Sequence, residues 1–132
     1  LGRALKQAPD DYAGLMMMSK CLLAQNKNGQ AKRFADKAKQ VYPQEAQANL
    51  VGGIAAIRQR RFDKAFYSFK QYEKLLPGNP SIAYLKGRSL EGMHRRQDAA
   101  EEYYRYLQIV NQGDPAKHAY QRLVQWGYIK PQ

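Results

Sequence analysis

The sequence predicts an all-α solenoid of stacked helix–turn–helix repeats, and two observations carry this prediction. Residues of the same kind recur every 34 positions, and each interval holds two segments of helical length separated by a turn signal. The recurring columns are Pro9, Pro43 and Pro77; Ala31, Ala65 and Ala99; Ser19, Gly53 and Gly87; Ala35, Phe69 and Tyr103; and Ala38, Tyr72 and Tyr106. A period of roughly 20–50 residues is typical of architectures that stack one supersecondary unit on the next.

Turn and cap signals place the helices inside each repeat. Asn26-Lys27-Asn28-Gly29 indicates the turn of the first repeat. Asn79-Pro80 and Asp114-Pro115 each put a capping residue before a proline at the first helical position. Pro43 and Pro77 follow the second helices, which proline cannot continue. The expected helices are residues 12–25 and 30–41, 46–59 and 63–75, 81–93 and 98–110, and 116–126.

The same register divides the chain. We expect repeats at 10–43, 44–77 and 78–113, followed by a capping helix and tail at 114–132. Residues 1–9 keep the period, because Ala4 lies 34 positions before Ala38, so they are expected to be the remnant of a preceding second helix. This predicts that the chain is a fragment of a longer protein. It also leaves open self-association through the apolar side of that truncated helix.

The small and aromatic columns have a packing reason. Ser19, Gly53 and Gly87 are expected to let each first helix approach its partner closely, and the alanine column does the same from the other side. Phe69 and Tyr103 then fill the space between neighbouring repeats. About three stacked repeats are needed to bury a continuous core, and this chain has three and a terminal helix.

Composition excludes several classes of protein. The 132 residues are 44% hydrophobic and 25% charged, which excludes a disordered or collagen-like chain. No apolar run approaches the roughly 18 residues of a membrane-spanning helix. The net charge of +11 favours an acidic partner: nucleic acid, an anionic membrane surface or an acidic peptide. Cys21 is the single cysteine, which excludes an internal disulfide, and its neighbours Leu22 and Leu23 predict that it is buried.

No catalytic pattern is present, so we expect a protein that is not an enzyme and has no cofactor, metal or small-molecule substrate. The histidines, His94 and His118, form no His-Glu-x-x-His motif, and neither a Gly-x-Ser-x-Gly elbow nor a phosphate-binding glycine loop occurs. His94 is expected to be a solvated turn residue. Adjacent Glu101 and Glu102 diverge on a helix and make a poor acid–base pair. The side chains of Met16, Met17 and Met18 likewise point three ways, which indicates core filling and one residue on a binding groove rather than a metal site.

The period and its Gly/Ser, Ala, aromatic and Pro columns resemble the tetratricopeptide repeat (TPR) family over residues 12–111. The resemblance implies a right-handed superhelical solenoid that binds a protein or peptide on a concave groove lined mainly by first helices. It departs from the family pattern early in the first helix, where Leu15, Asn49 and Ala83 replace Trp or another large residue.

The resemblance also implies which residues face the groove. They are Met16, Lys20, Leu23, Leu50, Ile54, Ile57, Tyr84, Arg88 and Glu91. Such a strip suits an extended or helical peptide with hydrophobic anchors, and Lys20 and Arg88 would attract its acidic groups. The open alternative is that some of these apolar residues contact neighbouring helices. The carboxylate clamp of chaperone-binding members is not expected, because Met16, Leu50 and Ile54 stand at its places.

A basic edge is the second candidate surface, formed by charged residues at the inter-helix turns. It comprises Arg58, Arg60, Arg61, Arg95 and Arg96. Two interpretations stay open: solvated charges that keep the chain soluble, or contact with anionic lipid, nucleic acid or an acidic partner domain. Nucleic acid is the less favoured partner, because the alanine columns and the proline register fit TPRs better than helical RNA-binding repeats.

The C-terminal segment carries a second resemblance. Tyr120, Leu123 and Val124 are expected to face inward on a capping helix, with Trp126 covering the end of the stack. The run from Ala119 through Trp126-Gly127-Tyr128 is similar to the ends of bacterial TPR-bearing members of the M48 zinc metallopeptidase family. That resemblance implies a parent protein in the bacterial periplasm or envelope; otherwise a cytoplasmic location is expected. The residues themselves leave the compartment open, and no zinc ligand is present to carry over.

Overall fold

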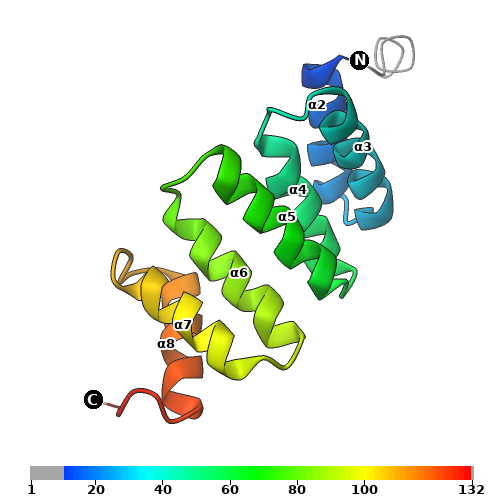
Figure 1. Cartoon of the computed structure of the whole chain (residues 1–132). Coiled ribbons are helices and arrows are strands. Elements are labelled where there is room, and N and C mark those ends of the chain that lie inside the picture. Colours follow the sequence, from blue (N-terminus) through cyan, green and yellow to red (C-terminus); the bar gives the residue numbers. More distant parts are fainter. Residues whose placement is uncertain (1–10, 132) are drawn as a thin grey trace. The chain divides into compact units, whose positions relative to one another are not determined.

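The computed structural model describes residues 11–131, and every regular element in this range is an α-helix (Figure 1). The all-α prediction is therefore confirmed. The remnant helix expected at residues 1–9, and the self-association inferred from it, lie outside the described residues. The helices are α2 (Tyr12–Ala24), α3 (Asn28–Val41), α4 (Gln47–Arg58), α5 (Phe62–Leu75), α6 (Pro80–Gly92), α7 (Arg96–Leu107) and α8 (Asp114–Gln125).

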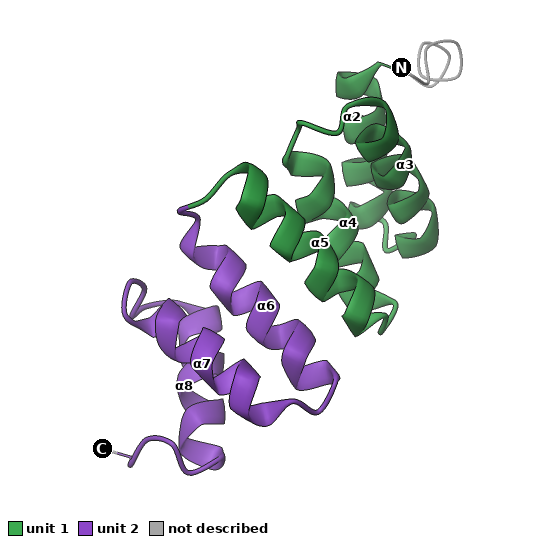
Figure 2. Ribbon diagram, viewed as in Figure 1, with its two compact units in different colours: residues 1–77 green, residues 78–132 purple. Residues whose placement is uncertain are grey.

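The helices belong to two compact units, which Figure 2 distinguishes by colour. Unit 1 ends at Pro77 and contains α2 to α5; unit 2 begins at Gly78 and contains α6 to α8. In unit 1 each helix packs against the next along the chain, and the first helices of its two repeats, α2 and α4, also touch. In unit 2, α6 packs against α7 and α7 against α8. None of the helices described is long and apolar enough to cross a membrane.

The turn inside each repeat has one conformation, repeated at the 34-residue period. Asn26, Arg60 and His94 have φ values of 62°, 61° and 62°, in the left-handed region. The residue after each of them donates its N–H to a carbonyl five positions back, as Arg61 does to Ala56 at 2.8 Å. This closure satisfies carbonyls at the end of the first helix and reverses the chain. The second helices therefore begin slightly earlier than expected, at Asn28, Phe62 and Arg96.

The two predicted capping signals before a proline have different outcomes: the one at Asn79 forms, and the one at Asp114 does not. The Asn79 Oδ1 accepts a hydrogen bond from the Ser81 N–H at 3.0 Å, with Pro80 in the first turn, as expected. Asp114 is instead the first residue of α8; the preceding cap residue is Gly113, and no side-chain cap bond forms. Gly113 has a φ of 99°, and this conformation lets the chain enter the helix one residue early.

The small column packs as predicted, whereas Phe69 and Tyr103, which were expected between neighbouring repeats, fill the space between the two helices of their own repeat. Phe69 and Tyr103 are fully buried, and so are the alanines of the Ala31 column. An ideal Cβ built on Gly53 would lie 2.5 Å from Phe69 Cε1, and one on Gly87 would lie 2.5 Å from Tyr103 Cε1. In the first repeat the aromatic residue is replaced by Ala35 and the glycine by Ser19, whose Oγ donates to the Ala31 carbonyl at 2.7 Å.

The prediction that Cys21 is buried is wrong, because its side chain is exposed. Successive residues of a helix point about 100° apart, and Leu22 takes the inward position, in a cluster with Ala31 and Ala55. Cys21 is therefore turned to the surface. Tyr72 and Tyr106 are buried and Tyr104 is exposed, as expected.

Candidate functional site

In unit 1, the first helices present partly exposed apolar side chains and one exposed lysine. Leu50, Ile54 and Ile57 recur on α4 at the spacing of one helical face, and all three are partly exposed. On the adjoining helix α2, Lys20 is exposed and Leu23 is partly buried against the core. These five residues are called the first-helix surface below.

Met16 does not belong to this surface, so the expectation that it faces the groove is wrong. Its side chain is only 5% exposed and packs with Leu15, Ala38, Ala48 and Val51. The physical reason is the size of Ala38, which stands where the other repeats have Tyr72 and Tyr106. The small side chain leaves space that Met16 fills.

In unit 2, the three expected groove residues have different surroundings. Tyr84 is partly buried, and its ring lies 5.7 Å from that of Tyr103 and 5.4 Å from that of Tyr106. It therefore belongs largely to an aromatic cluster, which was the open alternative. Arg88 is exposed, as an attracting charge must be. Glu91 is committed to a network of polar contacts.

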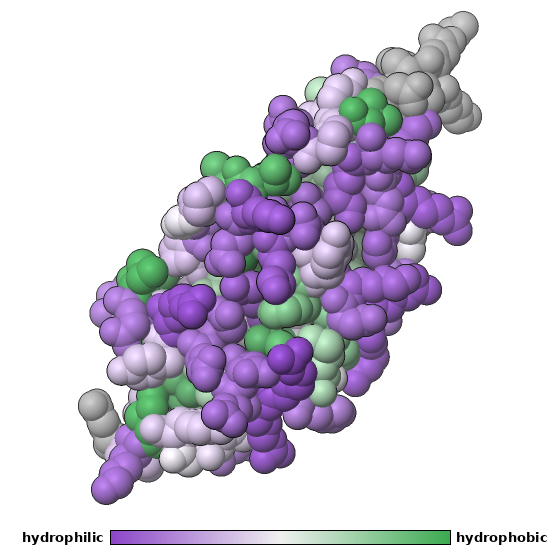
Figure 3. Space-filling view, in the orientation of Figure 1, coloured by the Kyte–Doolittle hydropathy of each residue, from purple (hydrophilic) through white to green (hydrophobic). Residues whose placement is uncertain are grey.

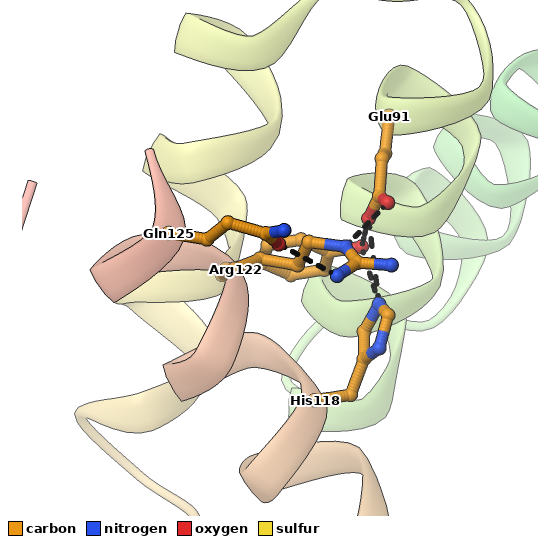
Figure 4. A network of polar contacts seen from close by, with 5 residues as sticks. Glu91, His118, Arg122 and Gln125 are labelled. Carbon is orange, nitrogen blue, oxygen red and sulfur yellow. Dashed lines mark hydrogen bonds and ion pairs between the residues drawn. The ribbon is translucent and has the colours of Figure 1, made fainter. Parts of the chain in front are cut away.

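That network joins α6, α7 and α8 (Figure 4). The Tyr103 hydroxyl donates to Glu91 Oε1 at 2.6 Å, and the Arg122 Nε donates to Glu91 Oε2 at 2.7 Å. The His118 Nε2 lies 3.4 Å from both Glu91 Oε1 and the Tyr103 hydroxyl. Arg122 Nη1 also donates to Gln125 Oε1 at 2.8 Å. The carboxylate of Glu91 thus has a strong partner at each oxygen, and Arg122 is held in one orientation.

Burial and these contacts shift the pKa values of the network. Burial works to raise the pKa of Glu91, but the hydrogen bonds from Tyr103 and Arg122 and the charges of Arg122 and His118 outweigh it, so that pKa lies below its usual value. Burial lowers the pKa of His118 in spite of the nearby Glu91 carboxylate, and the charges of Arg122 and Arg88 add to the lowering. Burial and the Glu91 carboxylate raise the pKa of Tyr103. At neutral pH Glu91 is therefore a carboxylate, His118 a neutral imidazole and Tyr103 a neutral phenol, with the Arg122 guanidinium bonded to the carboxylate.

A cavity of about 460 Å³ opens beside the network, wholly within unit 2. Its lining residues are Glu91, His94, Arg96, Arg122, Gln125 and Trp126. Trp126 is stacked on Tyr103 at 6.1 Å between ring centroids, and the Arg96 guanidinium lies 5.9 Å from the centroid of the indole ring. The sequence interpretation gave α8 only the role of a cap and missed its polar residues. The spacing of His118, Arg122 and Gln125, which puts them on one face of a helix, was the available signal.

Three arginines of the basic edge have partners within their own units. Arg58 Nη1 donates to the Leu23 carbonyl at 2.7 Å, Arg60 lies over the Phe62 ring, and Arg95 pairs with Asp98 at 2.6 Å. The other two arginines line cavities. Arg96 lines the cavity of unit 2 described above, and Arg61 lines a cavity in unit 1. The cavity of about 230 Å³ beside Arg61 in unit 1 is lined also by Gly29, Lys32, Arg33, Asp36, Gln59 and Lys64.

Among residues 11–131, no group of His, Cys, Asp and Glu side chains is arranged to hold a metal ion. Met16 is in the core, Met17 is 44% exposed, and Met18 packs against a different cluster, so the three methionines diverge. His94 is exposed at its turn.

Solved structures share the fold at low sequence identity. The Arabidopsis OM64 TPR domain is 17% identical, with 89% of this chain and 98% of that chain covered and a TM-score of 0.81. YrrB, described as a TPR protein with an unusual peptide-binding site, is 18% identical, with 96% and 66% covered and a TM-score of 0.79. The first TPR of Spaghetti (RPAP3), bound to the HSP90 peptide SRMEEVD, is 16% identical, with 87% and 91% covered and a TM-score of 0.79.

No protein-family model and no curated protein sequence matches the chain. The chain is all-helical and matches TPR solenoid structures, as the repeat columns predicted. None of the three structures named above is described as a metallopeptidase, so the resemblance of the C-terminal segment to that family stays a prediction.

Proposed function

We propose that this chain is a non-catalytic interaction module that binds a peptide or partner protein on its first helices. The observation that carries the proposal is the first-helix surface of unit 1. There Leu50, Ile54 and Ile57 share one face of α4, and all three are partly exposed. Partly exposed apolar side chains grouped on one face, with a charge beside them, are a common form of peptide-binding surface.

Contacts inside unit 1 hold this surface in place. The helices α2 and α4 touch, and the hydrogen bond from Arg58 to the Leu23 carbonyl ties their C-terminal ends together. A ligand would meet a prearranged surface and would not have to order it, which lowers the entropic cost of binding. Lys20, exposed on α2, would attract acidic groups of the ligand. The HSP90 peptide bound to RPAP3 also contains acidic residues, and that likeness supports this part of the proposal.

The test begins with peptides selected on the whole chain from a random display library. The binding of a selected peptide is then measured by calorimetry for the wild type, for Ile54→Glu and for Tyr67→Glu. Ile54 lies on the first-helix surface, and Tyr67 is a 63% exposed residue of the second helix α5, so the two variants add the same charge at different places. We expect Ile54→Glu to weaken binding by about thirtyfold, the usual cost of losing one anchor residue. Equal weakening by both variants, or no selected peptide at all, would contradict the proposal.

A second candidate function is the binding of an anionic partner, either nucleic acid or an anionic surface. The observation that favours this function is the cavity beside Arg61. Lys32, Arg33 and Lys64 also line this cavity, and Asp36 is the carboxylate in its lining. Figure 3 shows that hydrophilic side chains dominate the surface over α3, which carries Lys32, Arg33 and Asp36. Clustered cations of this kind raise the local concentration of anions.

The salt dependence of binding tests this second candidate. Affinity for a single-stranded oligonucleotide, and separately for vesicles with anionic lipid, is measured at about 50 and 200 mM salt, where phosphate-mediated binding falls steeply. Arg61→Gln should weaken binding at low salt. Arg60→Gln removes the same charge outside the cavity and should leave this binding unchanged. No binding at low salt, or equal loss in both variants, would remove this candidate.

The C-terminal resemblance extends the proposal to a parent protein in which this chain is the docking region of an envelope zinc metallopeptidase. The reading frame upstream of Leu1 tests this extension. A signal peptide and a helix with a His-Glu-x-x-His motif are the expected result. An unrelated domain there would leave the interaction module and remove the metallopeptidase.

A further inference from the structure

We propose that the cavity in unit 2 binds a carboxylate of a peptide ligand between the guanidinium groups of Arg96 and Arg122, with Trp126 as one wall. This inference deepens the proposed function and rests on its claim that the chain binds a peptide, because it names the chemical group of the ligand and a second place where that group is held. None of the residues that line the cavity belongs to the first-helix surface of unit 1.

The Arg122 guanidinium is held in place before any ligand arrives, and the Arg96 guanidinium lies against an aromatic ring. Arg122 is fixed from behind by Glu91 through Nε and from the side by Gln125 through Nη1. Its third nitrogen, Nη2, has no hydrogen-bond partner among the residues described. Arg96 lies over the indole of Trp126, which is itself stacked on the fully buried Tyr103. Prearranged guanidinium groups form strong, charge-assisted hydrogen bonds with carboxylates.

The wall of the cavity carries more positive than negative charge. Glu91 is its carboxylate, and both oxygens of that group already accept hydrogen bonds, from Tyr103 and from Arg122. With two arginines against one satisfied carboxylate, the wall carries a net positive charge. The wall therefore favours an incoming anion over a cation.

The size and the lining of the cavity suit a ligand larger than a carboxylate alone. A volume of about 460 Å³ exceeds that of a single carboxylate and lies in the range of ordinary ligand pockets. The indole of Trp126 gives the ligand an apolar wall next to the two cations. This combination suits a peptide segment that offers both a carboxylate and an apolar group. The carboxylate has two sources, the C-terminus of a peptide and an acidic side chain.

Trp126 supplies the readout, because it is the single tryptophan of the chain. Three acetylated tetrapeptides are titrated into the whole chain: one of alanine and leucine with a free terminal carboxylate, the same peptide amidated, and an amidated peptide with two glutamates. We expect a saturable change of the Trp126 fluorescence with the first or third peptide and none with the second. The free-acid peptide reports a terminal carboxylate, and the glutamate peptide reports side-chain carboxylates.

Arg95 provides a matched control for Arg96. Arg95→Gln and Arg96→Gln remove the same charge at neighbouring exposed positions, but only Arg96 lines the cavity, while Arg95 pairs with Asp98. Calorimetry gives the affinity of each variant without relying on the fluorescence of Trp126, which Arg96 itself contacts. Arg96→Gln should weaken binding about tenfold or more, as expected for the loss of one charge-assisted hydrogen bond. Arg95→Gln should stay close to wild type.

The outcomes separate this inference from the proposed function. If the acidic peptides cause no saturable change, or if Arg95→Gln and Arg96→Gln weaken binding equally, the cavity is not a carboxylate site. Binding of display-selected peptides that depends on Ile54 and not on Arg96 would overturn this inference and leave the proposed function intact. Dependence on Arg96 alone would contradict the first-helix proposal and support the cavity.

Discussion

The ring of Phe69 occupies the space that a side chain at Gly53 would need, because its Cε1 atom lies 2.5 Å from the ideal position of a Cβ there. The same relationship joins Gly87 and Tyr103, 34 residues later. The helix pairs of the second and third repeats are therefore each closed by a glycine on the first helix and an aromatic ring on the second. In the first repeat the larger Ser19 stands at the glycine position and the smaller Ala35 stands at the position of the ring. The side chains of these two columns therefore change size together.

This relationship predicts that Gly53→Ala destabilises the chain, although alanine favours helices by about 1 kcal/mol over glycine. The added methyl would overlap the buried Phe69 ring, and overpacking of this kind typically costs about 1–3 kcal/mol. Gly52→Ala is the matched control, since a Cβ there would lie 3.5 Å from that of Ala35, an ordinary contact. Urea unfolding of both variants checks the prediction. If Gly53→Ala is as stable as Gly52→Ala, the close packing is not what limits this position.

Tyr103→Phe should lower the free energy of unfolding because it removes the hydroxyl that donates to Glu91 at 2.6 Å. A hydrogen bond to a charged group contributes about 1.5–3 kcal/mol, and the ring itself would be retained. The neighbouring Tyr104, with a side chain that is 55% exposed, supplies the control, and Tyr104→Phe should change stability little. The comparison is made by urea unfolding at neutral pH. Equal stability of the two variants would show that the Glu91 network contributes nothing to the fold.

The stability of unit 2 should fall as the pH drops below the ordinary pKa of histidine, about 6.5. Burial holds the pKa of His118 below that value in the folded chain, with Glu91 opposing the shift and Arg122 and Arg88 adding to it. Between the two pKa values the unfolded chain therefore binds more protons, so acidification favours unfolding. The contribution is absent at higher pH, where both states are neutral.

His118→Gln isolates this effect, and His94→Gln is its control because His94 is exposed at a turn. Thermal unfolding is followed at pH 7.5 and at lower pH, and the drop in melting temperature should be smaller in His118→Gln than in the wild type. His94→Gln should keep the wild-type drop. If His118→Gln shows the full drop as well, the acid sensitivity arises elsewhere.

Arg60→Gly should stabilise the chain. Arg60 has a φ of 61°, a left-handed conformation that costs a residue with a side chain about 1–2 kcal/mol and costs glycine little. The equivalent residue of the first repeat is Asn26, which tolerates this conformation better, so Asn26→Gly should give a smaller gain. Thermal melting of the two variants ranks them. A loss of stability in Arg60→Gly would mean that contacts of its side chain, such as the one with the Phe62 ring, outweigh the backbone strain.

The repeat columns explain which parts of the structure could be predicted from the sequence. A position that recurs three times shows its role through what its members share, as the Gly53 and Phe69 columns do. Met16 was placed wrongly because its burial depends on Ala38, a member that departs from its own column. Cys21 was placed wrongly because neighbours along the chain, unlike residues three or four apart, do not share a helix face.

The polar network could not be predicted in the same way. Its members on α8, which are His118, Arg122 and Gln125, lie on a helix that follows the third repeat and belongs to none of the 34-residue columns, so no column reveals them. Glu91 stands in a column with Leu23 and Ile57, and its difference from these apolar residues was visible. What it bonds to depends on how α6, α7 and α8 pack together, which the spacing along the chain does not determine.

The central claim is that the first helices carry the binding surface, and amide chemical-shift mapping tests it most directly. A display-selected peptide is titrated into the isotope-labelled chain while the backbone amides are observed. We expect the largest shifts in unit 1 on α2 and α4, around Lys20, Ile54 and Ile57. Largest shifts on the second helices α3 and α5 instead would contradict the central claim.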